Sequence, residues 1–246
     1  MPKKKINKKE QKGKYNLPAA KLPMHPMERE IDLKRMSDIT WRIFRIMAEF
    51  VEGFQFLSQF KNEVTIFGSA RIDPKNKWYK EAEKLGELLA KNNYLVITGG
   101  GPGIMEAANK GAHKIDPKKS IGINIQLPAE QRTNPYVTKS KGFYYFFTRK
   151  VMLAASAQSY IFFPGGFGTS DEFFEMITLV QTGKMQKLPI ILVGKDFWQP
   201  MVNWLNKQMV TKYKTISPGD PKLFHLVDTA EETMKYIKKS KERTIF

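Results

Sequence analysis

The sequence alternates short apolar runs with longer segments in which apolar residues recur every three or four positions. The short runs have the length of buried strands, and the longer segments have the spacing of amphipathic helices. The predicted strands are 64–67, 94–98, 120–125, 159–163, 188–193 and 223–227. The predicted helices that follow strands are 79–89, 104–113, 151–157, 171–182, 197–210 and 229–239. This order predicts an α/β fold of the doubly wound, Rossmann-like type, with a mostly parallel sheet and helices on both faces.

A further helical pattern precedes the first strand. Its apolar residues recur at spacings of mostly three and four over about residues 28–58. The pattern predicts a long amphipathic helix whose apolar face covers the core or forms a dimer surface. A chain of 246 residues with 41% hydrophobic content can bury one sizeable core. We therefore expect a single α/β domain over residues 28–246, and an irregular loop over residues 127–141 within it.

Positive charge is concentrated at the N-terminus. The formal net charge is +17, of which +7 lies in the first 22 residues, where eight lysines face one glutamate. Residues 1–27 offer little to bury and are predicted to form a basic, disordered tail. Such a tail can bind nucleic acids by neutralising phosphates, but a solubilising role is the simpler interpretation. The remaining +10 still favours anionic ligands.

Composition excludes several classes of protein. No stretch approaches the roughly 18 apolar residues that span a membrane, and no apolar run follows the early lysines as in a secretory signal. The chain has no cysteine, which excludes disulfides and thiolate chemistry, and its three histidines are too dispersed for an obvious metal site. We predict a cytoplasmic protein with no metal, no cofactor and no membrane partner.

Three glycine-bearing loops follow predicted strands, at residue 68, at 99–103 and at 165–168. In doubly wound sheets, ligands bind at the carboxyl ends of the strands, beside the point where strand order reverses. We therefore expect these loops to converge on one site. Their spacing matches neither the dinucleotide fingerprint nor the P-loop, and the chain has no nucleophile elbow.

The third loop has the composition of a phosphate cradle with a carboxylate attached. Gly165, Gly166 and Gly168 let the backbone approach a ligand, and Thr169 offers a hydroxyl. Free N–H groups at the start of the next helix favour an anion. Glu172 follows within that helix. Because a phosphate needs no carboxylate beside it, the pairing indicates chemistry on another part of a nucleotide-like ligand.

Three segments, taken in order, resemble the LOG ("Lonely Guy") family. They are the run GGGPGIMEAANKGA at 99–112, the pair Arg149-Lys150, and the run PGGFGT at 164–169 with Glu172. Members are phosphoribohydrolases that activate cytokinins, and many bacterial ones carry the label possible lysine decarboxylase. The resemblance extends over about residues 64–194, which makes it far more specific than a lone glycine loop.

The resemblance implies hydrolysis of the N-glycosidic bond of a nucleoside 5′-monophosphate, such as AMP or an N6-substituted AMP, to free base and ribose 5-phosphate. It implies Arg149 and Glu172 as catalytic residues and a phosphate held by the cradle glycines and Thr169. A carboxylate can stabilise a ribosyl cation-like transition state and activate water, while a cation assists the departing base. The family also implies a homodimer.

Further residues on these loops are candidate contacts to ribose, base or phosphate. Glu106 and Asn109 lie one turn apart on their predicted helix, and could equally cap it or pair locally. The complete set is Ser69, Arg71, Gly100, Gly101, Met105, Glu106, Asn109 and Lys150.

Other classes of function remain open. A non-catalytic carrier of nucleotides or cofactors needs the glycines but has no use for a carboxylate near the ribose, so Arg149 together with Glu172 favours an enzyme. A decarboxylase would need a lysine that binds pyridoxal phosphate, which nothing in this pattern provides. The preferred base cannot be derived from the sequence.

Overall fold

The computed structural model describes residues 39–125 and 133–240. Its strands are β1 (Glu63–Phe67), β2 (Leu95–Thr98), β3 (Ser120–Ile125), β4 (Lys139–Phe143), β5 (Ser159–Phe162), β6 (Ile190–Val193) and β7 (His225–Val227). Its α-helices are α1 (Ile39–Leu57), α2 (Lys77–Lys91), α3 (Ile104–Ile115), α4 (Phe146–Ala155), α5 (Phe167–Gln181), α6 (Lys195–Trp204) and α7 (Ala230–Ile237). A π-helical segment, Leu205–Lys212, continues α6.

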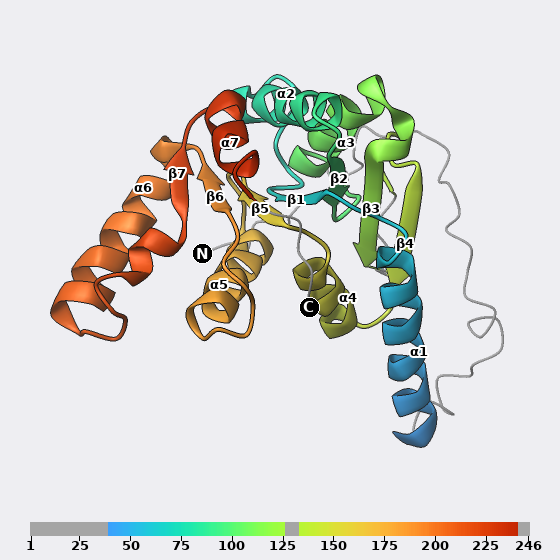
Figure 1. The fold of residues 1–246 in the computed structure, drawn as a ribbon, viewed down its shortest axis with the longest axis horizontal. Coiled ribbons are helices and arrows are strands. Elements are labelled where there is room, and N and C mark those ends of the chain that lie inside the picture. The colour runs from blue at the N-terminus through green and yellow to red at the C-terminus, as the bar shows by residue number, and fades with distance from the viewer. Residues whose placement is uncertain (1–38, 126–132, 241–246) are drawn as a thin grey trace, which may run out of the picture.

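All seven strands form one parallel sheet in the order β4-β3-β2-β1-β5-β6-β7 (Figure 1). Helices α2, α3 and α7 pack on one face of the sheet, and α1, α4, α5 and α6 pack on the other. Neighbouring residues of one strand serve opposite cores: Tyr160 and Phe162 face the second group of helices, and Ile161 faces the first. The predicted doubly wound α/β fold is confirmed, and its central strands are mostly apolar because both faces of the sheet are covered.

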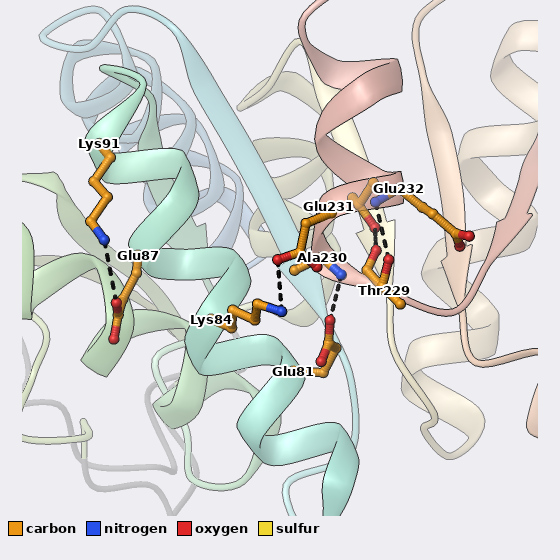
Figure 2. Close-up of polar contacts among 9 residues, drawn as sticks. Glu81, Lys84, Glu87, Lys91, Thr229, Ala230, Glu231 and Glu232 are labelled. Carbon is orange, nitrogen blue, oxygen red and sulfur yellow. Dashed lines mark hydrogen bonds and ion pairs between the residues drawn. The ribbon is translucent and has the colours of Figure 1, made fainter.

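The last helix, α7, is fixed to α2 by polar contacts as well as by packing (Figure 2). The Glu81 carboxylate of α2 accepts the backbone N–H of Ala230 at 2.5 Å, which satisfies a donor at the start of α7. Lys84 of α2 forms an ion pair with Glu231 of α7 at 2.6 Å. This pair is about half exposed on both sides, so it contributes little to stability.

The prediction of an irregular loop over residues 127–141 is wrong at its end. Residues 139–143 form β4, an edge strand that pairs with β3 from Ile121 opposite Lys139 to Ile125 opposite Phe143. Its first two residues are exposed and only Phe143 is buried. An edge strand with one covered face needs few apolar residues, and lysines on such an edge discourage pairing with other chains, so the apolar pattern is absent.

Two predicted helix starts are also wrong, and both matter for the site. Helix α4 begins at Phe146 rather than at residue 151, and α5 begins at Phe167 rather than at residue 171. Aromatic residues and glycine have low helix propensity, which hides these first turns in the sequence. The Arg149-Lys150 pair and Thr169 therefore lie inside helices rather than in the loops before them.

The N-terminal predictions are tested only in part. The described helix α1 covers the later portion of the helix predicted over about residues 28–58. The basic tail predicted for residues 1–27 lies outside the described residues. None of the helices in the two described ranges is both long and apolar enough to cross a membrane.

Candidate active site

The direction of the sheet's connections reverses at β1, which lies between β2 and β5. The loops that follow these strands are tied together by their backbones. The N–H of Ser69 donates to the carbonyl of Pro164 at 3.0 Å, and the N–H of Ile104 donates to the carbonyl of Ser69 at 3.1 Å. Gly103 has a φ of +70°, and a Cβ there would lie 2.3 Å from the Ser69 oxygen. The predicted convergence of the three glycine loops is confirmed, at the place where doubly wound sheets bind ligands.

The cradle has open space around two of its glycines, as far as the described residues define it. Gly166 is the N-cap of α5, and no side chain accepts a hydrogen bond there. A Cβ on Gly166 or Gly168 would meet no atom of residues 39–125 or 133–240 within 4 Å, whereas one on Gly165 would lie 2.1 Å from Oγ1 of Thr169. Phe167, between the two open glycines, is 97% exposed. The first N–H groups of α5 are therefore accessible to a ligand, and the helix dipole makes an anion the favoured one.

Glu172 lies in the second turn of α5 and is only 5% exposed. Its Oε2 atom has no hydrogen-bond partner within the described ranges. Burial raises the pKa of Glu172 to about 8, the nearby Glu175 adds to the rise, and the charges of Lys150 and Arg149 oppose it. A buried carboxyl with an unsatisfied oxygen is costly unless something else binds it, which is typical of a functional group.

Lys150 connects α4 to the acidic residues of α5. Its Nζ lies 2.6 Å from Oδ2 of Asp171 and 3.4 Å from Oε2 of Glu175. Burial lowers the pKa of Lys150, but its bond to Asp171 and the charges of Glu175 and Glu172 outweigh this, so the pKa is raised. For Glu175, burial is the largest effect and raises the pKa, while Lys150 opposes it. The three carboxyl groups and one ammonium therefore form a single charged cluster beside the cradle.

Arg149 points toward the same region from α4. Its Nε donates to the carbonyl of Ile123 at 3.0 Å, which fixes the guanidinium. A Cβ on Gly99 would lie 2.5 Å from Nη2 of Arg149 and 2.8 Å from Sδ of Met105, so a larger residue there would force these side chains to shift. Burial lowers the pKa of Arg149, and the charge of Glu172 counteracts this effect. The structure thus brings together Arg149 and Glu172, as predicted, with Met105 beside the guanidinium.

Asn109 holds the second glycine loop in place. It is fully buried, and its Oδ1 accepts from Oγ1 of Thr98 at 2.6 Å and from Nδ2 of Asn134 at 3.0 Å. Thr98 in turn accepts the N–H of Gly100 at 2.9 Å, and Asn134 donates to the carbonyl of Gly101 at 3.0 Å. These bonds support the local pairing that the sequence left open for Asn109, whereas its contact with a ligand stays a prediction.

Glu106 is also engaged locally. Its carboxylate accepts the hydroxyl of Tyr79 at 3.0 Å, between α3 and α2. Burial, followed by the charge of Glu106, raises the pKa of Tyr79 far above its usual value. Ser69 and Arg71 lie in the loop after β1, where the Ser69 hydroxyl accepts the backbone N–H of Arg71 at 3.0 Å. Ser69 therefore lies in the loop after β1, where the strand order reverses, whereas the carboxylate of Glu106 lies between α2 and α3.

Two polar residues of the site were missed from the sequence. Asn124, near the end of β3, lies against Gly100: a Cβ on that glycine would be 2.5 Å from Nδ2 of Asn124. Oδ1 of Asn124 is buried and has no hydrogen-bond partner within the part of the chain that the structure describes. The other is Glu175, which could have been found from its spacing, since it lies three residues beyond Glu172 on the same helix.

Comparison with known sequences supports a relationship to hydrolases of nucleotides. A family model described as "Possible lysine decarboxylase" matches residues 105–237. A probable cytokinin riboside 5′-monophosphate phosphoribohydrolase of Oryza sativa subsp. japonica is 26% identical over 188 residues, covering 75% of this chain and 74% of the relative. A cytokinin riboside 5′-monophosphate phosphoribohydrolase of Arabidopsis thaliana is 28% identical over 181 residues, covering 72% and 82% respectively.

Solved structures share the fold. The molybdenum cofactor binding protein of Rippkaea orientalis is 22% identical with a TM-score of 0.51, over 72% of this chain and 93% of that one. The Moco carrier protein of Chlamydomonas reinhardtii is 19% identical with a TM-score of 0.52, over 73% and 97%. At these identities the likeness concerns the arrangement of strands and helices alone.

Proposed function

The chain belongs to the LOG family, and from this membership we propose that it hydrolyses the N-glycosidic bond of a nucleoside 5′-monophosphate. The products are a free base and ribose 5-phosphate, and the proposed substrate is AMP or an N6-substituted AMP such as a cytokinin riboside monophosphate. The observation that carries the proposal is the buried carboxyl of Glu172: its Oε2 has no hydrogen-bond partner among the described residues, and its charge interacts with that of Arg149 beside the N-terminus of α5.

The phosphate is proposed to bind at the first turn of α5. The N–H groups around Gly166 and Gly168 are accessible there, and the Thr169 hydroxyl adjoins Gly165. Ser69 and its loop adjoin this position through the bond to Pro164. A phosphate held at this point fixes the ribose relative to the catalytic residues, which supplies much of the entropic part of catalysis.

The proposed reaction divides the work between the two helices. The oxygen of water attacks the anomeric carbon, and the electron pair of the N-glycosidic bond leaves with the base. The Glu172 carboxylate stabilises the positive charge that develops on the ribose and accepts a proton from water, while the guanidinium of Arg149 stabilises the electron-rich base. The base gains a proton from solvent or from the site as it departs.

The pH dependence of the reaction follows from the raised pKa of Glu172. Its carboxylate, the reactive form, becomes the main form only above about pH 8 in the free protein. We therefore expect kcat/KM for base release to rise about tenfold per pH unit below this value and to level off above it. The measurement is kcat/KM for AMP over a series of buffers at constant ionic strength.

The variant Glu175→Gln tests the cause of that pH dependence. It removes a like charge beside Glu172 and releases Lys150, and both effects lower the pKa of Glu172. The rising limb should therefore move to lower pH. The matched control is Glu231→Gln, an exposed residue that pairs with Lys84 on the opposite face of the sheet. A limb that stays in place in Glu175→Gln would contradict the proposed coupling.

The decisive experiment for the proposed function is an incubation of the purified protein with a panel of nucleoside 5′-monophosphates, followed by chromatography of the free base. We expect base release from at least one adenine nucleotide, and a kcat/KM for adenosine lower than for AMP by about 10²-fold or more, because the phosphate contacts are lost. Equal rates with and without the phosphate would refute the cradle. Nucleotide binding without any base release would favour the alternative of a non-catalytic carrier.

The remaining expectations concern assembly and location. The outward faces of α1 and α4 carry exposed apolar side chains, among them Trp41, Phe44, Met47 and Phe146. These support the proposal of a homodimer. A cytoplasmic location, and nucleic-acid binding through the basic tail, stay predictions from the sequence.

A further inference from the structure

A residue of α1 caps the helix that carries Arg149. Helix α4 starts after Tyr145, and no side chain of its own N-cap accepts a hydrogen bond. The Glu49 carboxylate does so instead: Oε1 accepts the N–H of Tyr144 at 2.7 Å, and Oε2 accepts the N–H of Tyr145 at 3.3 Å. Oε2 also accepts the hydroxyl of Thr148 at 2.5 Å. One carboxylate from a distant segment therefore binds three donors at the start of α4.

We propose that Glu49 is a positioning residue for the proposed hydrolysis, acting through Arg149. Arg149 directly follows Thr148, and its N–H donates to the carbonyl of Tyr145 at 3.2 Å, which closes the first turn of α4. A carboxylate at a helix N-terminus satisfies free donors and complements the dipole, so it holds this turn in its helical form. Without it, the first turn frays and the guanidinium loses its fixed direction.

Further contacts of α1 with the domain lie nearer its C-terminal end. Only Gly53 and Leu57 are buried among the residues of α1 whose burial is described. Gly53 approaches α4 closely, since a Cβ there would lie 2.5 Å from Sδ of Met152. Glu52 forms an ion pair with Lys141 of β4. The carboxylate of Glu49 links α1 to the start of α4.

Charged side chains lie on both sides of the start of α4. Arg45, one turn earlier on α1, lies over the ring of Tyr144 at 4.2 Å, and Arg42 lies 6.0 Å from the ring of Tyr145. These cations flank the capped turn from the α1 side. The Lys150 cluster lies on the α5 side of α4. Glu49 therefore contacts the N-terminus of α4, whereas the acidic residues of α5 contact Lys150, which lies further along α4.

The first test measures the cap itself, by amide hydrogen exchange in NMR spectra of the full-length protein. In Glu49→Ala, the amides of Tyr144 and Tyr145 should exchange about tenfold faster or more, because charged hydrogen bonds to them are lost. The control is Glu52→Ala, which removes a carboxylate one turn along α1 that pairs with Lys141 of β4. Equal exchange in Glu49→Ala and wild type would overturn the proposal.

The second test measures the consequence for catalysis, and this part rests on the proposed function. In Glu49→Ala, kcat for base release should fall about tenfold while KM for the nucleotide changes less than about twofold, because the cradle on α5 is untouched. Added to Arg149→Ala, the same change should lower kcat no further. Multiplying losses in the double variant would show that Glu49 does not act through Arg149.

Failure of the proposed hydrolysis and failure of the proposed role of Glu49 can be distinguished. If the wild-type protein releases no base, the proposed function fails, but amide exchange still decides whether Glu49 holds α4. If Glu49→Ala does not fold, Glu49→Gln keeps an acceptor oxygen in place and should show an intermediate effect on both readouts. A Gln variant with wild-type exchange and wild-type kcat would then overturn the proposal.

Discussion

Replacing Glu172 with glutamine is expected to lower kcat for base release by about 10²-fold or more. The variant keeps the size of a buried side chain but cannot carry the negative charge that stabilises the ribosyl cation or accept the proton of water. The measurement is single-turnover release of adenine from AMP, followed by chromatography. Glu231→Gln, the same substitution at the exposed ion pair with Lys84, is the control and should keep wild-type kcat. Release of adenine by Glu172→Gln at the wild-type rate would contradict the proposed mechanism.

The same variant should also change how stability depends on pH. Because the folded-state pKa of Glu172 is raised to about 8, the folded protein binds a proton there that the unfolded chain has already lost. The unfolding free energy of the wild type therefore falls as pH rises from about 4.5 to about 8, by up to a few kcal/mol from this group. Glutamine does not titrate, so the unfolding free energy of Glu172→Gln does not fall in this way. In urea unfolding at about pH 8, the variant should therefore have a higher unfolding free energy than the wild type.

Arg149→Ala is expected to cause the second large loss, a fall in kcat of about 10²-fold or more. The guanidinium is fixed by Ile123 and lies over Gly99, so its removal takes away the cation that assists the departing base. Millimolar guanidinium should restore part of the activity to Arg149→Ala, since a small cation can enter the vacated space. It should have no such effect on Glu172→Gln, which serves as the control.

A different outcome would assign Arg149 another role. If Arg149→Ala raises KM alone and leaves kcat unchanged, the arginine binds substrate and transition state equally. If the variant loses activity only because α4 unfolds, its thermal unfolding midpoint falls sharply and guanidinium restores nothing. The variant Arg149→Lys helps to separate a catalytic from a structural role of Arg149. It keeps the positive charge but lacks the planar guanidinium with its fixed array of N–H donors.

The central elements of the fold could be predicted from the sequence because they are covered on both faces. Strands β1, β2, β3, β5 and β6 are short and mostly apolar, and the loops after three of them contain the glycines of the site. β4 could not be predicted, because an edge strand with exposed lysines has neither the apolar run nor the alternation of a strand. The first turns of α4 and α5 were missed because their aromatic and glycine residues are poor helix formers.

The candidate site residues that could be predicted lie within short motifs, and their roles stay predictions. The cradle, Arg149 and Glu172 are read from such motifs, and the structure brings them together. Glu49 could not be found in this way, because its partners lie about a hundred residues later in the chain. Asn124 shows the same limit, since its position against Gly100 depends on the pairing of β2 with β3. Contacts between segments distant in sequence leave no local pattern.

The connection made by α4 has a consequence for how the protein folds. Helix α4 leads from β4, at one edge of the sheet, to β5, beside the central β1, so it crosses β3, β2 and β1. Arg149 lies in this crossover helix, whereas Glu172 lies in α5, which follows β5. The two residues can meet only after both halves of the sheet have joined, which requires closure of long loops. The proposed site is therefore expected to form late in folding, and a chain with only one half of the sheet assembled would lack it.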